Sequence, residues 1–215
     1  MMKIAFLGDS ITFGYGLEHQ DERYSSVVCR RLEIEEENYG ITGTLIARAG
    51  MNRTDGKSFL DRLHLMEGAD IAVVFGGTND YFWSDRPIGT IDSADDYFAG
   101  AVERLCQTLT EMRKGKKTLL VTPYSHHGIG NFQGGETYQT SSEHDTTEIN
   151  FNGHVLQDYV DSIVKIGEKW KIPVLNLHET PGFNWNIHTI DGCHPNQEGH
   201  LWLADQMEYI LRGWL

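Results

Sequence analysis

Residues 3–14 read KIAFLGDSITFG: an apolar run that ends on a glycine, then an Asp-Ser pair, then a second glycine four residues on. Short runs rich in Val, Ile and Leu, without polar alternation, are typical of parallel strands buried on both faces. We therefore predict a strand at residues 2–7. Runs of the same kind predict four more strands, at residues 42–48, 70–76, 117–122 and 172–177.

Between these runs, apolar residues recur at spacings of three and four, which predicts amphipathic helices. The predicted helices cover residues 24–32, 93–113, 155–170 and 196–212. Strands that alternate with helices imply an α/β fold whose parallel sheet has helices on both faces. We expect one domain over residues 1–215, with an irregular insertion at about 123–150 that lies over or beside the functional site.

Composition limits the partners. The formal net charge is −13, which disfavours nucleic acid and anionic membranes. No apolar run approaches the roughly 18 residues of a membrane span. The N-terminal residues do not resemble a signal peptide, and the three cysteines (Cys29, Cys106 and Cys193) are far apart. We therefore expect a cytoplasmic protein with reduced thiols.

Polar residues follow several predicted strands, where parallel sheets form their sites. Ser10 follows the first strand, and Asn79, in GGTND, follows the third. Near the C-terminus, DGCHPN places Asp191 three residues before His194. A nucleophilic serine needs a base, an orienting acid and donors for an oxyanion, and these residues could supply them. Each motif alone is common as a turn or helix cap, so the prediction depends on their joint occurrence.

Other patterns favour simpler interpretations. Residues 50–58, GMNRTDGKS, resemble a phosphate-binding loop, but five residues separate the glycines where that motif has four. His126, His127 and His144 lack the spacing of a zinc site, and we interpret them as solvated loop residues. Cys193 directly precedes His194, and because adjacent side chains usually diverge we expect an inert thiol rather than a catalytic Cys-His pair. No metal or organic cofactor is expected.

The chain resembles the SGNH hydrolases, also called GDSL-type esterases and lipases. GDSITFG, the Gly-Thr-Asn-Asp of residues 77–80 and the Asp191–His194 spacing match three blocks of that family, in family order. A fourth block is a lone glycine, which Gly50 matches most weakly. The resemblance implies a flavodoxin-like three-layer α/β/α sandwich with a five-stranded parallel sheet.

The resemblance also implies roles. Ser10 is the expected nucleophile, His194 the base and Asp191 its orienter, while the amides of Ser10 and Gly50 and the Asn79 side chain form the oxyanion hole. Asp9 and Asp80 are expected to shape their turns.

The expected reaction is hydrolysis of a carboxylic ester through an acyl-serine. Large aromatic residues flank the expected site, and Tyr81, Trp83 and Trp185 are candidate substrate contacts. Their bulk favours a short acyl group such as acetyl, on a small molecule or sugar. The alternatives are a lipase, lysophospholipase or thioesterase of the same family, an acyltransferase, and a non-catalytic binding module. The sequence leaves the oligomeric state open.

Overall fold

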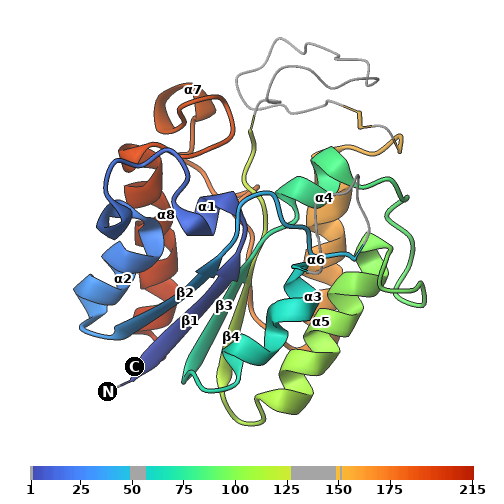
Figure 1. The fold of residues 1–215 in the computed structure, drawn as a ribbon, viewed down its shortest axis with the longest axis horizontal. Coiled ribbons are helices and arrows are strands. Elements are labelled where there is room, and N and C mark those ends of the chain that lie inside the picture. Colours follow the sequence, from blue (N-terminus) through green and yellow to red (C-terminus); the bar gives the residue numbers. More distant parts are fainter. Residues whose placement is uncertain (1, 49–56, 127–148, 151) are drawn as a thin grey trace.

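A parallel sheet of five strands forms the centre of the molecule (Figure 1). This computed structural model describes residues 2–48, 57–126, 149–150 and 152–215. The strands are β1 (Lys3–Gly8), β2 (Glu35–Gly40), β3 (Ile71–Phe75), β4 (Lys117–Val121) and β5 (Val174–Leu175), in the order β2-β1-β3-β4-β5. This is the order of flavodoxin-like sheets, in which ligands bind at the carboxyl ends of the strands, where the order reverses. Here the reversal lies between β1 and β3.

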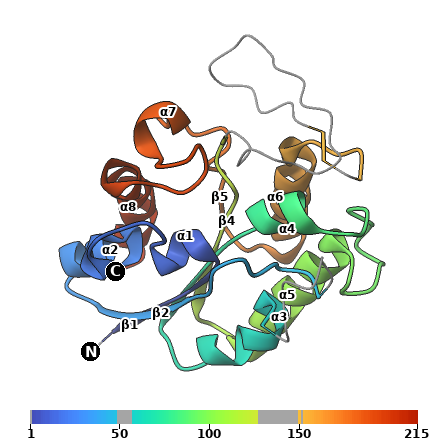
Figure 2. The same ribbon diagram turned by 45° about the horizontal axis from the view of Figure 1, so that its top comes forward.

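Helices cover both faces of the sheet and complete the predicted three-layer sandwich. In Figures 1 and 2, α2 and α8 lie on one face, and α3, α5 and α6 on the other. Short helices α1, α4 and α7 lie near the carboxyl ends of the strands. The α-helices are α1 (Ser10–Phe13), α2 (Tyr24–Leu32), α3 (Phe59–Arg62), α4 (Thr78–Trp83), α5 (Phe98–Met112), α6 (Leu156–Trp170), α7 (Trp185–His188) and α8 (Gln197–Arg212), and 3-10 turns occupy Gln20–Glu22 and Leu63–Met66.

The central strands bury side chains in two cores. Along β1, Ile4 and Phe6 face the core with α2 and α8, whereas Ala5 and Leu7 face the core with α3, α5 and α6. Because successive side chains of a strand point to opposite faces, a strand covered on both sides reads as an unbroken apolar run. None of the described helices has the length and apolar character that crossing a membrane requires.

The second predicted strand was wrong. The chain forms β2 from EEENYG, not from residues 42–48. β2 is an edge strand that pairs only with β1, and Lys3 of β1 forms ion pairs with Glu35 and Glu37. An edge strand tolerates charged side chains, so it carries no apolar run. Within residues 42–48, only residues 44–47 are buried, and they form a loop beside α4 rather than a strand.

Helix boundaries agree with the sequence prediction except at α5, which begins at Phe98 rather than residue 93. A Cβ atom on Gly100 would lie 2.3 Å from the carbonyl oxygens of Ser93 and Ala94. The segment before α5 therefore crosses the first turn of the helix instead of extending it. Of the predicted insertion at 123–150, only residues 123–126 and 149–150 are described.

Candidate active site

Ser10 is the first residue of α1, directly after β1. Asp9 caps this helix, since its carboxylate accepts the N–H of Ile11 at 3.0 Å. The turn requires glycine at position 8, because a Cβ there would lie 1.9 Å from the Thr12 hydroxyl oxygen. The glycine thus lets the chain reverse tightly from strand to helix, and this places Ser10 at the carboxyl end of the sheet.

Asp191, His194 and Ser10 form a continuous series of hydrogen bonds. Nδ1 of His194 lies 2.6 Å from the carboxylate of Asp191, and Nε2 lies 3.1 Å from Oγ of Ser10. The other Asp191 oxygen accepts the backbone N–H groups of Cys193 and His194 at 3.0 and 2.7 Å. A carboxylate bound in this way fixes the orientation of the imidazole, so that Nε2 faces the serine hydroxyl.

The loop that carries Asp191 and His194 is held at several points. Gly192 has a φ of 91°, which favours glycine, and its N–H donates to the Thr189 hydroxyl. Thr189 and Pro195 form an antiparallel bridge across the loop. Tyr124 lies three residues after the end of β4, and its hydroxyl donates to the carbonyl of Cys193 at 2.5 Å. These contacts fix the backbone of the loop and thereby the position of the His194 imidazole.

Asn79 is the second residue of α4, after β3. Gly77 precedes it with a φ of 113°, so the chain turns sharply from strand to helix. One N–H of the Asn79 side chain donates to the carbonyl oxygen of Thr44 at 3.1 Å. This bond fixes the plane of the side-chain amide, which has a second N–H to offer.

Two buried carboxyl groups lie beside these residues. Burial raises the pKa of Asp9 to about 6, against the lowering effect of the Ile11 N–H. Burial likewise raises the pKa of Asp80 to about 7, although its oxygens accept the N–H groups of Ile46 and Ala47 at 2.9 and 3.0 Å. These contacts agree with the expectation that Asp9 and Asp80 shape turns.

Asp191 differs from them. Burial alone would raise its pKa, but the hydrogen bonds from the ring and backbone of His194 and from the backbone of Cys193 outweigh it. The net effect is a pKa below the usual range, so Asp191 is ionised at neutral pH. A histidine beside an ionised carboxylate is stabilised when it takes up a proton.

An apolar rim borders His194 on the solvent side. The ring of Tyr15 lies on the His194 ring, with centroids 4.5 Å apart and planes inclined by 46°. Tyr15 is 45% exposed, and the exposed Ile190 belongs to the same rim, since its backbone N–H donates to the carbonyl of His194 at 2.9 Å. Sequence reasoning missed these residues, because no local pattern distinguishes a rim residue from an ordinary loop residue.

The predicted substrate residues lie in different surroundings. Tyr81 is 1% exposed and packs against Phe82 and Tyr159, which leaves its ring no open face for a substrate. Trp83 and Trp185 are half-buried. Gly50 lies outside the described residues, so its place in the oxyanion hole stays a prediction.

The histidine interpretation needs a correction. His126 is not solvated: it is 1% exposed and packs against the rings of Phe82 and Tyr124. His127 and His144 lie outside the described residues. Within the described chain, no group of three or more His, Cys, Asp or Glu side chains could hold a metal ion. Cys193 is buried, and burial raises the pKa of its thiol, as expected of an inert cysteine.

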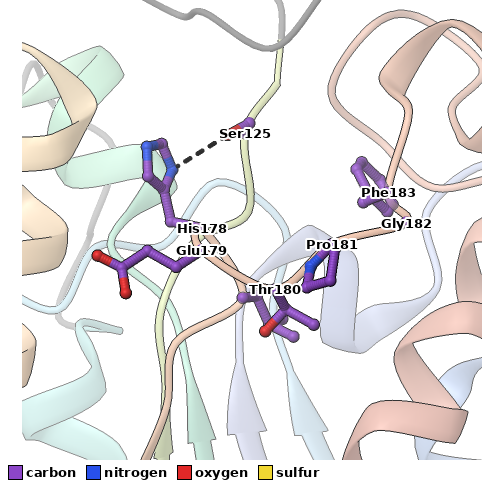
Figure 3. A pocket seen from close by; sticks show the side chains of 8 residues that line it. Ser125, His178, Glu179, Thr180, Pro181, Gly182 and Phe183 are labelled. Carbon is purple, nitrogen blue, oxygen red and sulfur yellow. Dashed lines mark hydrogen bonds between the residues drawn. The ribbon is translucent and has the colours of Figure 1, made fainter.

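A second serine–histidine contact lies at the ends of β4 and β5 (Figure 3). The Oγ atom of Ser125 is 3.4 Å from Nδ1 of His178. Both residues line a pocket of about 350 Å³ together with residues 179–183. The contact is longer than that between Ser10 and His194, and it uses the other ring nitrogen. Ser125 therefore offers a control for experiments on Ser10.

Comparisons with known proteins agree with this geometry. Residues 6–202 match the GDSL-like Lipase/Acylhydrolase family. A protein from Lactobacillus plantarum is 24% identical, with a TM-score of 0.82 and coverage of 100% of this chain and 98% of that one. An aryl esterase from M. smegmatis is 18% identical, with a TM-score of 0.71 and coverage of 100% of both chains. A carbohydrate acetylesterase family member from Sinorhizobium meliloti is 19% identical, with a TM-score of 0.66 and coverage of 99% of this chain and 98% of that one.

At these identities, the solved structures show a shared fold. A sequence search of curated proteins found no match. The family match, by contrast, extends from β1 into α8 and includes Ser10, Asn79, Asp191 and His194. The chain therefore belongs to the GDSL-like lipase and acylhydrolase family, within the SGNH hydrolases, and is a carboxylic ester hydrolase.

Proposed function

We propose that this chain is a serine esterase that hydrolyses short-chain acyl esters, acetyl esters above all, of a small molecule or sugar. The observation that carries the proposal is the series of hydrogen bonds from Asp191 through His194 to Ser10, at 2.6 and 3.1 Å. A serine becomes nucleophilic when a base within hydrogen-bond reach takes its proton. Ser10 and His194 meet that distance before any substrate binds.

The mechanism has two halves. Ser10 Oγ attacks the ester carbonyl while His194 Nε2 takes its proton, and the carbonyl oxygen becomes an oxyanion. The oxyanion accepts hydrogen bonds from the backbone N–H of Ser10 and the free side-chain N–H of Asn79, with Gly50 as the third expected donor. His194 then gives its proton to the leaving alcohol, and an acyl-serine remains. Water, activated by His194, releases the acid and restores Ser10.

The core beside Asn79 supports a short acyl group. Tyr81 and Phe82 of α4 are both buried, and their rings contact each other and His126. Aromatic rings thus fill the interior next to the proposed oxyanion donor, where a long acyl chain would otherwise enter. The exposed rim of Tyr15 and Ile190 instead offers apolar surface to the alcohol part of the ester.

The nucleophile can be identified by labelling. A serine-directed phosphonate should modify Ser10, and Ser10→Ala should abolish ester hydrolysis. Ser125→Ala is the matched control, since Ser125 also contacts a histidine, and it should retain activity. A phosphonate found on Ser125, or full activity in Ser10→Ala, would contradict the proposal.

Acyl length can be tested with acetyl, butanoyl, octanoyl and palmitoyl esters of one alcohol. We expect the highest kcat/KM for acetyl, with a graded decline, because each methylene changes discrimination by about 1–3 kcal/mol. A maximum at octanoyl or beyond would make a lipase or lysophospholipase the better assignment. Product analysis with an added alcohol measures acyl transfer in the same experiment.

A cytoplasmic location is part of the proposal. Cys29, Cys106 and Cys193 are all buried and unpaired. Free thiols suit a reducing compartment. Thiol titration of the protein as isolated from the cell should find all three cysteines reduced. Because they are buried, they should react with the thiol reagent only after the protein is unfolded. A disulfide between two of them would argue against this location.

A further inference from the structure

Arg62, the last residue of α3, is a buried cation next to the proposed oxyanion hole. Its side chain is 6% exposed. The guanidinium donates to the carbonyls of Lys57 at 2.9 Å and Gly8 at 3.2 Å, to the carbonyl of Tyr39, and to the Thr44 hydroxyl at 2.9 Å. Its acceptors are therefore three backbone carbonyls and one hydroxyl.

Such a group is costly to bury. Burial lowers the pKa of Arg62 to about 10, against the raising effect of the charges on Asp9 and Asp61. A buried charge is tolerated only when hydrogen bonds satisfy it, and an apolar side chain of similar size would fill the same space at lower cost. The contacts of the guanidinium, rather than its bulk, are thus the feature to explain.

The contacts join two strand ends. Gly8 is the last residue of β1, just before Asp9 and Ser10, and Tyr39 lies at the end of the neighbouring β2. Their carbonyls point to one guanidinium, whose donors lie in one rigid plane. Arg62 therefore holds the point from which the Ser10 turn departs.

The same guanidinium reaches Asn79 through Thr44. The Thr44 hydroxyl accepts from Arg62 and donates to the carbonyl of Ile41 at 2.8 Å. The Thr44 carbonyl accepts the side-chain N–H of Asn79 at 3.1 Å. Three residues thus connect in series, and none of the links between Arg62 and Asn79 is exposed, since Thr44 is itself buried.

We propose that Arg62 is a positioning residue, which acts through Thr44 to hold the Asn79 amide at the oxyanion and, through Gly8, to hold the Ser10 turn. This inference rests on the proposed function. A donor must lie within about 2.7–3.1 Å of the oxyanion to stabilise it, so a small displacement of the Thr44 carbonyl lowers kcat more than substrate affinity.

The chain offers a matched control in Arg113. It is 3% exposed, and its guanidinium also donates to backbone carbonyls, those of Ala69 and Lys117, each at 3.1 Å. These carbonyls lie at the amino ends of β3 and β4, away from the site. Arg62→Lys and Arg113→Lys should both lower Tm. Only Arg62→Lys should lower kcat, by roughly tenfold or more, with a small change in KM.

Thr44→Val provides a second variant, should Arg62→Lys fail to fold. This substitution keeps the shape of the side chain but removes the hydroxyl that accepts from Arg62 and donates to the Ile41 carbonyl, so kcat should again fall. Thr44→Ser retains the hydroxyl and should recover most of the lost kcat.

A double-mutant cycle decides whether the effect passes through Asn79. If it does, Thr44→Val should have little further effect on kcat in an Asn79→Ala background, because coupled residues are not additive. The inference would be overturned if Thr44→Val lowered kcat by the same factor in the wild-type and Asn79→Ala backgrounds, or if Arg62→Lys and Arg113→Lys lowered kcat equally. Either result would leave the proposed function standing. Wild-type kcat in Asn79→Ala would reject the proposed oxyanion donor, and the inference with it.

Discussion

Tyr15 shows how a residue outside the hydrogen-bonded series can affect it. Its ring lies on His194, with centroids 4.5 Å apart, and His194 becomes a cation when it takes the serine proton. An aromatic face stabilises a cation by about 0.5–1 kcal/mol at an exposed site. Tyr15→Ala should therefore lower kcat by about two- to fivefold, measured with an acetyl ester.

Tyr15→Phe is the control for that measurement, because it keeps the ring and loses only the hydroxyl. It should retain most of the wild-type kcat. Since Tyr15 is largely exposed, neither variant should unfold the protein. Equal kcat in Tyr15→Ala and Tyr15→Phe would show that the ring contact does not act on His194.

Asn79 gives the second residue-scale prediction. Removal of one oxyanion donor costs roughly 10²–10³ in kcat, or about 3–4 kcal/mol, and we expect this loss in Asn79→Ala. Asn79→Asp should be at least as damaging, because a carboxylate cannot donate and repels the oxyanion. Steady-state kinetics at pH 8 measure both variants. An Asn79→Asp enzyme more active than Asn79→Ala would contradict the assignment.

At the scale of elements, a histidine joins the two helices on one face of the sheet. Nδ1 of His200, in α8, accepts the N–H of Tyr24, the first residue of α2, at 3.2 Å. Burial lowers the pKa of His200 from 6.5 to about 3, and the charge of Arg23 adds to this effect. The folded protein thus keeps this ring neutral at a pH where the unfolded chain protonates it.

The contribution of the neutral His200 ring to the free energy of unfolding depends on pH. This contribution is fully present above pH 6.5 and is lost as the pH falls from 6.5 toward 3. His200→Gln removes this titration, so the stability difference between wild type and variant should narrow between pH 7 and pH 4.5. Urea unfolding at the two pH values measures it, and carboxylates common to both proteins cancel. A difference independent of pH would mean that His200 is not kept neutral by the fold.

Helices and strands could be predicted from the apolar pattern of the sequence where one or both of their faces are buried. The helices α2, α6 and α8 carry clear apolar stripes, β3 is apolar throughout, and β1 and β4 each carry an apolar run after an initial lysine. β2 was not predictable by this rule, because three of its residues are glutamates that form ion pairs, Glu35 and Glu37 with Lys3 and Glu36 with Arg23. The run at residues 42–48 misled the prediction, since its apolar residues are buried by α4, whose Asp80 takes the place of a strand partner for Ile46 and Ala47.

For the molecule as a whole, we expect catalysis without a metal ion. His194 contacts both Ser10 and Asp191 directly, and the described chain has no cluster suited to a metal. Prolonged chelation should leave ester hydrolysis unchanged. Loss of activity that one added metal restores would point instead to the histidines of the 123–150 segment.

The sequence predicted the site residues whose chemistry shows in a local motif, and the structure brings Ser10, Asp191 and His194 together. It did not identify Arg62, Thr44 or Tyr15. The guanidinium of Arg62, for example, contacts Thr44 and Gly8, which are 18 and 54 positions away. No spacing rule links an arginine in one helix to a carbonyl at the end of a distant strand. Such roles become visible only after the chain has folded.

The contact between Ser10 and His194 joins positions 184 residues apart. During synthesis at about 5–20 residues per second, the serine is made roughly 10–40 s before its base. Through that interval the nascent chain carries an ordinary alcohol, which cannot attack esters in the surrounding cell. The order of residues along the chain therefore delays the assembly of the Ser10–His194 pair until His194 has been made.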